Sequence, residues 1–132
     1  MTVQAGWAAL RLELFVDDVP AARAFYTQVL GFTAGAAHDD GYVPLQRGSA
    51  RLALNARAAL PAAHPIQAAP GERLGRGIEL VLEVEDVAAA YAQVQAAGWP
   101  LASTLARRPW GLVDFRVVDP DGYYVRVTAA RA

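Results

Sequence analysis

An internal repeat constrains the fold of this chain more than any other feature of its sequence. When the sequence is shifted by 68 positions, Leu10–Ala24 lies over Ile78–Ala92, with eight identities among fifteen positions. Further along, Leu30-Gly31-Phe32 corresponds to Ala97-Gly98-Trp99 after a gap of one residue. The chain is therefore expected to contain two similar halves.

Each half has the pattern of one strand, one helix and then two or three strands. Each opening strand is followed by an aspartate suited to a helix N-cap, Asp18 or Asp86, and each helix is expected to end near a glycine, Gly31 or Gly98. We expect one α+β domain over residues 1–132, with module one at about 8–56 and module two at about 77–130. A linker rich in alanine, proline and glycine is expected at about 57–76. The later strands are predicted at Tyr42–Gln46, Arg51–Asn55, Val113–Val118 and Tyr123–Thr128.

The composition excludes several classes of protein. Of the 132 residues, 55% are hydrophobic and the net charge is −1, which argues against disorder, nucleic-acid binding and binding to an anionic membrane. The chain has no cysteine, so it cannot form a disulfide or a thiolate metal site. Its two histidines, His38 and His64, lack a partner at ligand spacing and are expected to be ordinary exposed residues. The N-terminal stretch Met1–Ala9 lacks the features of a signal peptide, so a cytoplasmic location is expected.

Several motifs resemble the glyoxalase/bleomycin resistance/dioxygenase superfamily, also called the vicinal oxygen chelate superfamily. They are Leu14-Phe15-Val16-Asp17-Asp18-Val19, Ala24-Phe25-Tyr26, Leu30-Gly31-Phe32, Pro109-Trp110-Gly111 and Asp119-Pro120-Asp121-Gly122. The resemblance implies two βαβββ modules whose curved mixed sheets enclose a cavity. It also implies a homodimer with clefts at or near the subunit interface.

The resemblance also indicates where a metal would bind. Metalloenzymes of the superfamily carry His or Glu ligands at positions that correspond here to Arg11, Ala53, Glu79 and Arg126. Only Glu79 could ligate a metal, because arginine stays protonated and repels a cation. We therefore expect no metal and no cofactor, as in the metal-free bleomycin resistance proteins. Arg11, Glu79 and Arg126 are expected to form a charge network in the cavity, or one of them anchors a polar group of a ligand.

Strand alternation predicts which side chains line the cavity. If Leu10, Leu12, Leu14 and Val16 pack on the helices, the residues between them point to the open face. Trp110 is the main candidate for ligand contact. The resemblance implies this role, because a tryptophan in a similar Pro-Trp-Gly turn stacks on the ligand of bleomycin resistance proteins. Alternatively, the Trp110 indole only closes the cavity. The predicted ligand-binding residues are Trp110, Tyr42, Phe15, Glu13, Gln46, Leu112, Asp114 and Tyr124.

These observations favour a binding protein over an enzyme. No residue is a candidate nucleophile, and we expect the chain to sequester an aromatic natural product that is bleomycin-like, quinone-like or enediyne-like, giving resistance or self-protection. The alternative is a lyase, isomerase or dioxygenase with an atypical metal site or with Glu13 or Glu79 as general base. A third possibility is a sensor or partner-binding module. Trp99 is expected in the core or an interface, and Trp7 could pack across a dimer interface.

Overall fold

Module one is a four-stranded mixed sheet with one helical segment. The computed structural model of the chain describes residues 6–131, so Met1–Ala5 of the N-terminal stretch lie outside the described residues. The elements of this module are β1 (Leu12–Val16), α1 (Val19–Ala24), the π-helix η1 (Phe25–Val29), β2 (Thr33–Ala34), β3 (Val43–Arg47) and β4 (Ala50–Ala56). The strand order is β1-β4-β3-β2, with β1 parallel to β4 and the other pairs antiparallel.

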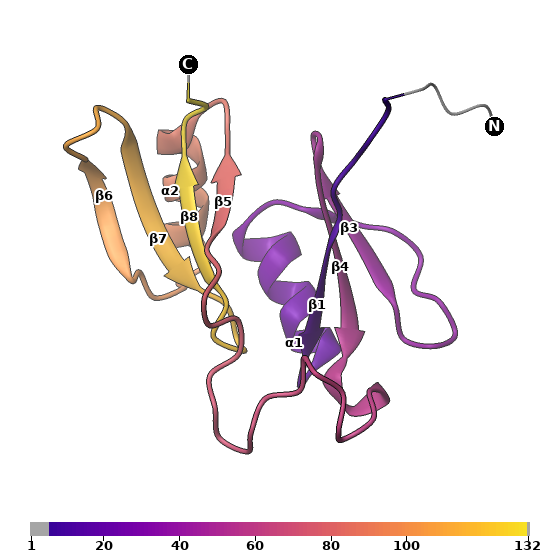
Figure 1. Cartoon of the computed structure of the whole chain (residues 1–132). Coiled ribbons are helices and arrows are strands. Elements are labelled where there is room, and N and C mark those ends of the chain that lie inside the picture. Colours follow the sequence, from indigo (N-terminus) through magenta and orange to yellow (C-terminus); the bar gives the residue numbers. More distant parts are fainter. Residues whose placement is uncertain (1–5, 132) are drawn as a thin grey trace.

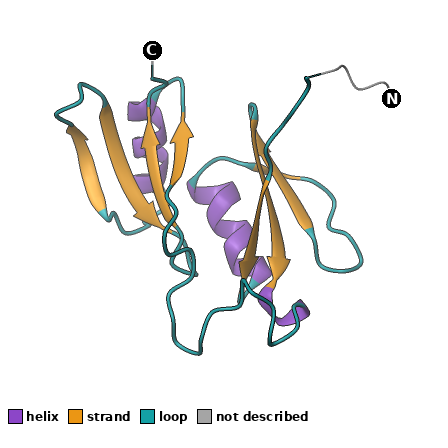
Figure 2. Ribbon diagram, in the orientation of Figure 1, coloured by secondary structure: helices purple, strands orange, loops and turns teal. Residues whose placement is uncertain are grey.

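Module two repeats this architecture. Its elements are β5 (Leu80–Glu83), α2 (Val87–Ala96), β6 (Ser103–Arg107), β7 (Val113–Val118) and β8 (Tyr124–Thr128). The strand order is β5-β8-β7-β6, again with one parallel and two antiparallel pairs. Figure 1 shows the two sheets as separate layers, and Figure 2 shows a helix against one face of each. The predicted fold class of two βαβββ modules is confirmed.

Equivalent aspartates begin the two helices. The side chain of Asp18 accepts a hydrogen bond from the backbone N–H of Ala21, and Asp86 accepts one from Ala89, both at 3.0 Å. These bonds satisfy N–H groups that the first helical turn leaves free, as the sequence predicted. The first helical segment continues from α1 into a π-helical turn, a change that the sequence did not predict.

The helix-facing residues of both sheets form the core, with one exception to the predicted pattern. Leu14 and Val16 are buried as expected, whereas Leu10 and Leu12 are 81% and 37% exposed. The prediction that all four pack on the helices is therefore wrong at its N-terminal end. The reason is that β1 begins only at Leu12, and the segment before it extends away from the sheet (Figure 1).

The two modules pack together through the first helical segment. Figure 1 shows α1 between the two sheets, and the ring of Phe25 lies 4.8 Å from that of Trp99 in an edge-to-face contact. The indole N–H of Trp99 donates to the carbonyl of Val118. Trp99 is thus packed against the core, as predicted. Buried side chains of both modules belong to one continuous core.

Residues 57–79 connect the modules and are mostly irregular. They contain the short 3₁₀-helix η2 (Arg57–Ala59), and Leu74 is buried. The guanidinium of Arg57 pairs with Asp17 at 2.8 Å, and its Nη1 donates to the carbonyl of Ala68. These contacts fix the connection against module one. Within residues 6–131, none of the helices has the length and apolar character needed to cross a membrane.

Candidate functional site

The face of sheet two opposite α2 carries two arginines at its centre. Arg116 on β7 is registered directly across from Arg126 on β8. Their strand neighbours Phe115, Val117, Val125 and Val127 point the other way and are buried in the core. Because side chains alternate along a strand, the two guanidiniums lie together on the open face of the sheet. Two like charges directly opposite each other are unfavourable unless a negative group lies near them.

A buried carboxylate organises the arginines of this face. Asp114 is fully buried, and its Oδ1 lies 2.7 Å from Nε of Arg108 and 3.5 Å from Nε of Arg116. Arg108 also donates to the hydroxyl of Ser103 at 2.7 Å. The pKa of Arg116 is raised above its usual value, first by a side-chain hydrogen bond with Tyr124 and then by Asp114, against the effect of burial. Asp114, predicted to contact a ligand, instead lies beneath the arginines and holds them in place.

A tight loop places Trp110 over Arg126. In residues 108–112, the N–H of Arg108 donates to the carbonyl of Leu112 at 2.8 Å, and the N–H of Gly111 donates to the carbonyl of Arg108 at 2.9 Å. Gly111 has a φ of 91°, a conformation that favours glycine. The Trp110 side chain is 45% exposed, and the guanidinium carbon of Arg126 lies 5.8 Å from the centre of its ring. This distance is within the range of a cation–π contact.

Module one has the same loop with different side chains. The N–H of His38 donates to the carbonyl of Tyr42 and the N–H of Gly41 to that of His38, and Gly41 also has a φ of 91°. The Tyr42 ring lies 4.9 Å from His38, and the guanidinium carbon of Arg11 lies 5.7 Å from its centre. Tyr42, Arg11 and Gln46 line a cavity of about 530 Å³ on the open face of sheet one.

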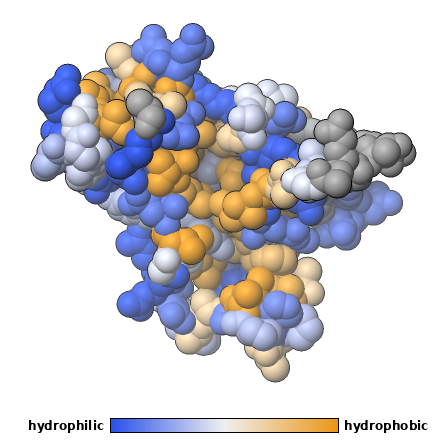
Figure 3. Space-filling model, turned by 45° about the horizontal axis from the view of Figure 1, so that its top comes forward, coloured by the Kyte–Doolittle hydropathy of each residue, from blue (hydrophilic) through white to orange (hydrophobic). Residues whose placement is uncertain are grey.

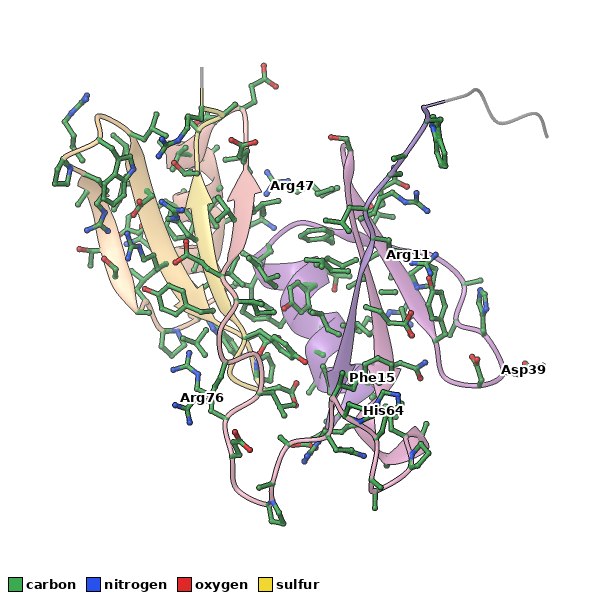
Figure 4. The ribbon with its side chains drawn as sticks, in the orientation of Figure 1. Arg11, Phe15, Asp39, Arg47, His64 and Arg76 are labelled. Atoms are coloured by element: carbon green, nitrogen blue, oxygen red, sulfur yellow. The ribbon has the colours of Figure 1, made fainter. Side chains whose placement is uncertain are left out.

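Two other predicted residues lie near the connection between the modules. Glu13 and Phe15 line a second cavity, of about 370 Å³, whose other wall is formed by residues 66–78. Glu13 accepts a hydrogen bond from Asn55, and the carbonyl of Phe15 accepts one from the hydroxyl of Tyr123. In Figure 4, Phe15 lies at the end of β1 far from the N-terminus, whereas Arg11 lies beside the loop that carries Asp39.

The predicted site residues therefore divide into groups within one chain. Glu79 and Arg126 form an ion pair at 2.8 Å, but Arg11 lies on the other module over Tyr42, so the three do not form one network. Tyr124 and Leu112 are half-buried near Arg116 and Trp110.

Of the two histidines, His38 is exposed as expected. His64 is half-buried, and its Nδ1 accepts a hydrogen bond from the N–H of Ile66, contrary to the expected exposure.

Sequence reasoning missed Arg108 and Arg116 as site residues. Strand alternation does place Arg116 on the open face, between Phe115 and Val117, but Arg116 was not selected as a ligand-binding residue. Arg108 gave no such signal, since the loop that folds it back onto Asp114 depends on the backbone conformation of Gly111.

The whole chain was compared with known families and structures. The model of the "Glyoxalase/Bleomycin resistance protein/Dioxygenase superfamily" matches residues 8–127. The chain belongs to this superfamily. A comparison with curated proteins gave no match.

Solved structures of the same fold cover nearly all of the chain. A protein of unknown function from Agrobacterium tumefaciens str. C58 is 26% identical, with a TM-score of 0.76, and the alignment covers 97% of this chain and 98% of that one. TioX from Micromonospora sp. ML1 is 22% identical, with a TM-score of 0.75 and coverage of 93% and 98%. A lactoylglutathione lyase from A. tumefaciens is 25% identical, with a TM-score of 0.69 and coverage of 93% of both chains.

The residues at the superfamily's metal positions do not fit a metal ion. The Glu79 carboxylate is paired with Arg126, and Ala53 is fully buried and has no donor atom in its side chain. A zinc site needs three or four donor side chains or waters, and the two arginines add positive charge instead. Within residues 6–131, no group of three His, Cys, Asp or Glu side chains is placed to hold a metal.

Proposed function

We propose that this superfamily member binds an aromatic natural product without a metal, and gives antibiotic resistance or self-protection by sequestering it in the cytoplasm. The observation that carries the proposal is the half-exposed indole of Trp110, held by a tight loop over the open face of sheet two. A flat ligand can stack on this ring, since offset stacking adds about 0.5–1.5 kcal/mol beyond burial. Bleomycin-like, quinone-like and enediyne-like compounds are the candidate classes.

A second copy of the chain would complete the binding site. β1 and β5 form the outer edges of the two sheets, and apolar side chains beside both edges are exposed: Trp7, Leu10, Leu12, Ile78 and Val81. Figure 3 shows hydrophobic side chains gathered in the hollow between the modules, where a groove of about 240 Å³ is lined by residues of β1 and β5. Exposed apolar sheet edges favour pairing with another chain. We propose a homodimer in which β1 of one copy lies beside β5 of the other.

Such pairing would bring two aromatic residues to one cleft. If the two edges meet, the open face of sheet one continues into the open face of the other copy's sheet two. Tyr42, with its cavity of about 530 Å³, would then lie on the same surface as Trp110 of the other copy. A volume of this size suits a drug-sized ligand.

The experiment that tests this function is a titration of protein freed of metal by a chelator. Bleomycin, a quinone antibiotic and an enediyne are added while tryptophan fluorescence is followed. We expect at least one to bind with a Kd in the micromolar range or tighter, about −8 kcal/mol. Trp110→Ala should weaken that binding about tenfold, because the stacking surface is lost. The control Arg23→Ala shortens an exposed side chain on α1, away from Trp110 and from the proposed interface, and should bind normally.

An enzymatic function is the second candidate. The similarity to a lactoylglutathione lyase from A. tumefaciens favours it. Glu13 lines the cavity of about 370 Å³ and accepts a side-chain hydrogen bond from Asn55. In that case Glu13 would act as general base. Conversion of a bound ligand that stops in Glu13→Gln would favour this candidate over sequestration.

A further inference from the structure

The arginine cluster on the open face of sheet two has more positive than negative charge. Three arginines, Arg108, Arg116 and Arg126, face two carboxylates, Asp114 and Glu79, which leaves a formal charge of +1. Asp114 divides its charge between Arg108 and Arg116, since a single oxygen faces both guanidiniums. The cluster is therefore not neutral by itself.

Several buried polar atoms in this cluster have no hydrogen-bond partner. Among residues 6–131, these atoms are Nε of Arg116, Nε of Arg126 and Oδ2 of Asp114. Nε of Arg126 lies 2.8 Å from the Glu79 carboxylate. This contact is an ion pair, but its geometry is not that of a hydrogen bond. Buried polar groups are nearly always satisfied in folded proteins, so the two Nε donors without a partner point to an acceptor that is bound when the protein functions.

The position of the arginines indicates the charge of that group. Arg116 and Arg126 lie directly opposite each other on adjacent strands, and Asp114, which Arg116 shares with Arg108, and Glu79 offset only part of the repulsion within this arginine cluster. A guanidinium presents its donors in a plane that matches a carboxylate. A carboxylate between the two arginines would offset their repulsion and receive hydrogen bonds from both.

The neighbouring indole indicates what the carboxylate is attached to. Trp110 lies above Arg126, and nearly half of its surface is open. A planar ring stacked on this indole would carry a carboxyl group directly over the arginine pair. We infer that the ligand is an aromatic carboxylate, whose acid group binds Arg116 and Arg126 and whose ring stacks on Trp110. This inference rests on the proposed function and narrows its ligand class.

The test compares two probes that differ only in charge. Binding of 2-naphthoate and of neutral 2-naphthamide is measured by isothermal titration calorimetry. We expect 2-naphthoate to bind about tenfold tighter or more, because hydrogen bonds to a charged group are the stronger ones. Raising KCl from about 0.05 to about 0.3 M should weaken the binding of 2-naphthoate and leave that of 2-naphthamide unchanged, since salt screens the charge contact alone.

Matched variants test whether the preference for 2-naphthoate depends on Arg116 and Arg126. Arg116→Gln and Arg126→Gln should each weaken 2-naphthoate binding about tenfold while 2-naphthamide binding is kept, and retained 2-naphthamide binding also shows that each variant is folded. Arg23→Gln is the control, because Arg23 is an exposed arginine on α1 in the other module. Equal affinity for the two probes, or failure of both to bind, would overturn the inference.

The outcomes separate this inference from the proposed function. If both probes bind equally and both depend on Trp110, the aromatic site stands and the carboxylate assignment is overturned. If 2-naphthoate binds through the arginines while natural ligands are converted to products, the carboxylate assignment stands and sequestration is overturned.

Discussion

At the scale of single residues, one buried carboxylate joins the two modules. Asp119 is 4% exposed and accepts four hydrogen bonds. Three come from the backbone N–H groups of residues 121–123, which close the Asp-Pro-Asp-Gly turn. The fourth comes from the hydroxyl of Tyr26 in module one, at 2.8 Å. Burial and the nearby Asp119 charge raise the pKa of Tyr26 well above its usual value, so this hydroxyl stays a donor.

Replacement of Asp119 should therefore destabilise the whole protein. Asp119→Ala leaves three N–H groups and the Tyr26 hydroxyl without their acceptor, and we expect a loss of about 3 kcal/mol in the free energy of unfolding. Asp119→Asn keeps an acceptor oxygen for the turn and should cost about 1 kcal/mol. Urea unfolding followed by circular dichroism measures both. Equal losses for the two variants would contradict this role of the carboxylate oxygen.

The same turn should give the stability an unusual pH dependence. Burial is the main cause that raises the pKa of both Asp119 and Asp121 above 3.8, against the hydrogen bonds that lower it. The native state then binds more protons than the unfolded state above pH 3.8, so the contribution of these groups to stability falls as the pH rises through their native pKa values.

The measurement is urea unfolding at several pH values from about 4 to 6. We expect the free energy of unfolding to fall with rising pH in the native sequence, and to fall less in Asp119→Asn, because that variant keeps only the contribution of Asp121 from this pair. A free energy that rises with pH over this range would contradict the expected sign.

Sequence alone predicted some residue roles and missed others for physical reasons. The N-caps Asp18 and Asp86 were predictable, because their bonds span three residues. The contact of Tyr26 with Asp119 spans 93 residues and depends on how the modules pack. Likewise, strand alternation placed Arg11 on an open face. Its separation from Arg126 could not be predicted, because it depends on how the two sheets are arranged.

At the scale of elements, the edges of the two sheets should determine assembly. β1 and β5 carry exposed apolar residues beside their unpaired edges, and Leu10 is the most exposed of these, at 81%. A charge at Leu10 cannot disturb the core of one chain, but it would be buried unpaired in the proposed dimer. Leu10→Asp should therefore dissociate the dimer without lowering the stability of the monomer.

Analytical ultracentrifugation measures dissociation of the dimer as a decrease in molecular mass. We expect about twice 14.1 kDa for the native sequence and 14.1 kDa for Leu10→Asp. Ile66→Asp is the matched control, because Ile66 is 54% exposed but lies in the connection between the modules. A native chain that sediments at 14.1 kDa would contradict the proposed dimer.

The element order was the most predictable level of the structure. The repeat placed both opening strands, both helices and the paired strands β3–β4 and β7–β8, because apolar alternation has a clear period. The short edge strands β2 and β6 were not located, since two to five residues at a sheet edge carry little pattern. The equivalence of the loops at 38–42 and 108–112 was also hidden, because their side chains differ while their backbones match.

At the scale of the whole molecule, the packing of the modules separates their open faces. α1 lies between the two sheets, so Tyr42 and Trp110 occupy different faces of one chain. The sequence predicted both as cavity residues, and the resemblance implied a cleft at a dimer interface, but the sequence could not predict that the two residues lie on different sheets of one chain. Each chain carries Tyr42 and Trp110 on separate sheets, and assembly of the proposed dimer would bring one of each into a single cleft.

The central claim is that this cleft binds an aromatic ligand and leaves it chemically unchanged. The most direct measurement incubates chelator-treated protein with one equivalent of the best ligand of the antibiotic panel, and then analyses the released ligand by mass spectrometry. We predict stoichiometric binding and recovery of the intact ligand, with binding weakened about tenfold in Trp110→Ala. Conversion of the ligand to a product, or binding only after a metal is added, would contradict the account.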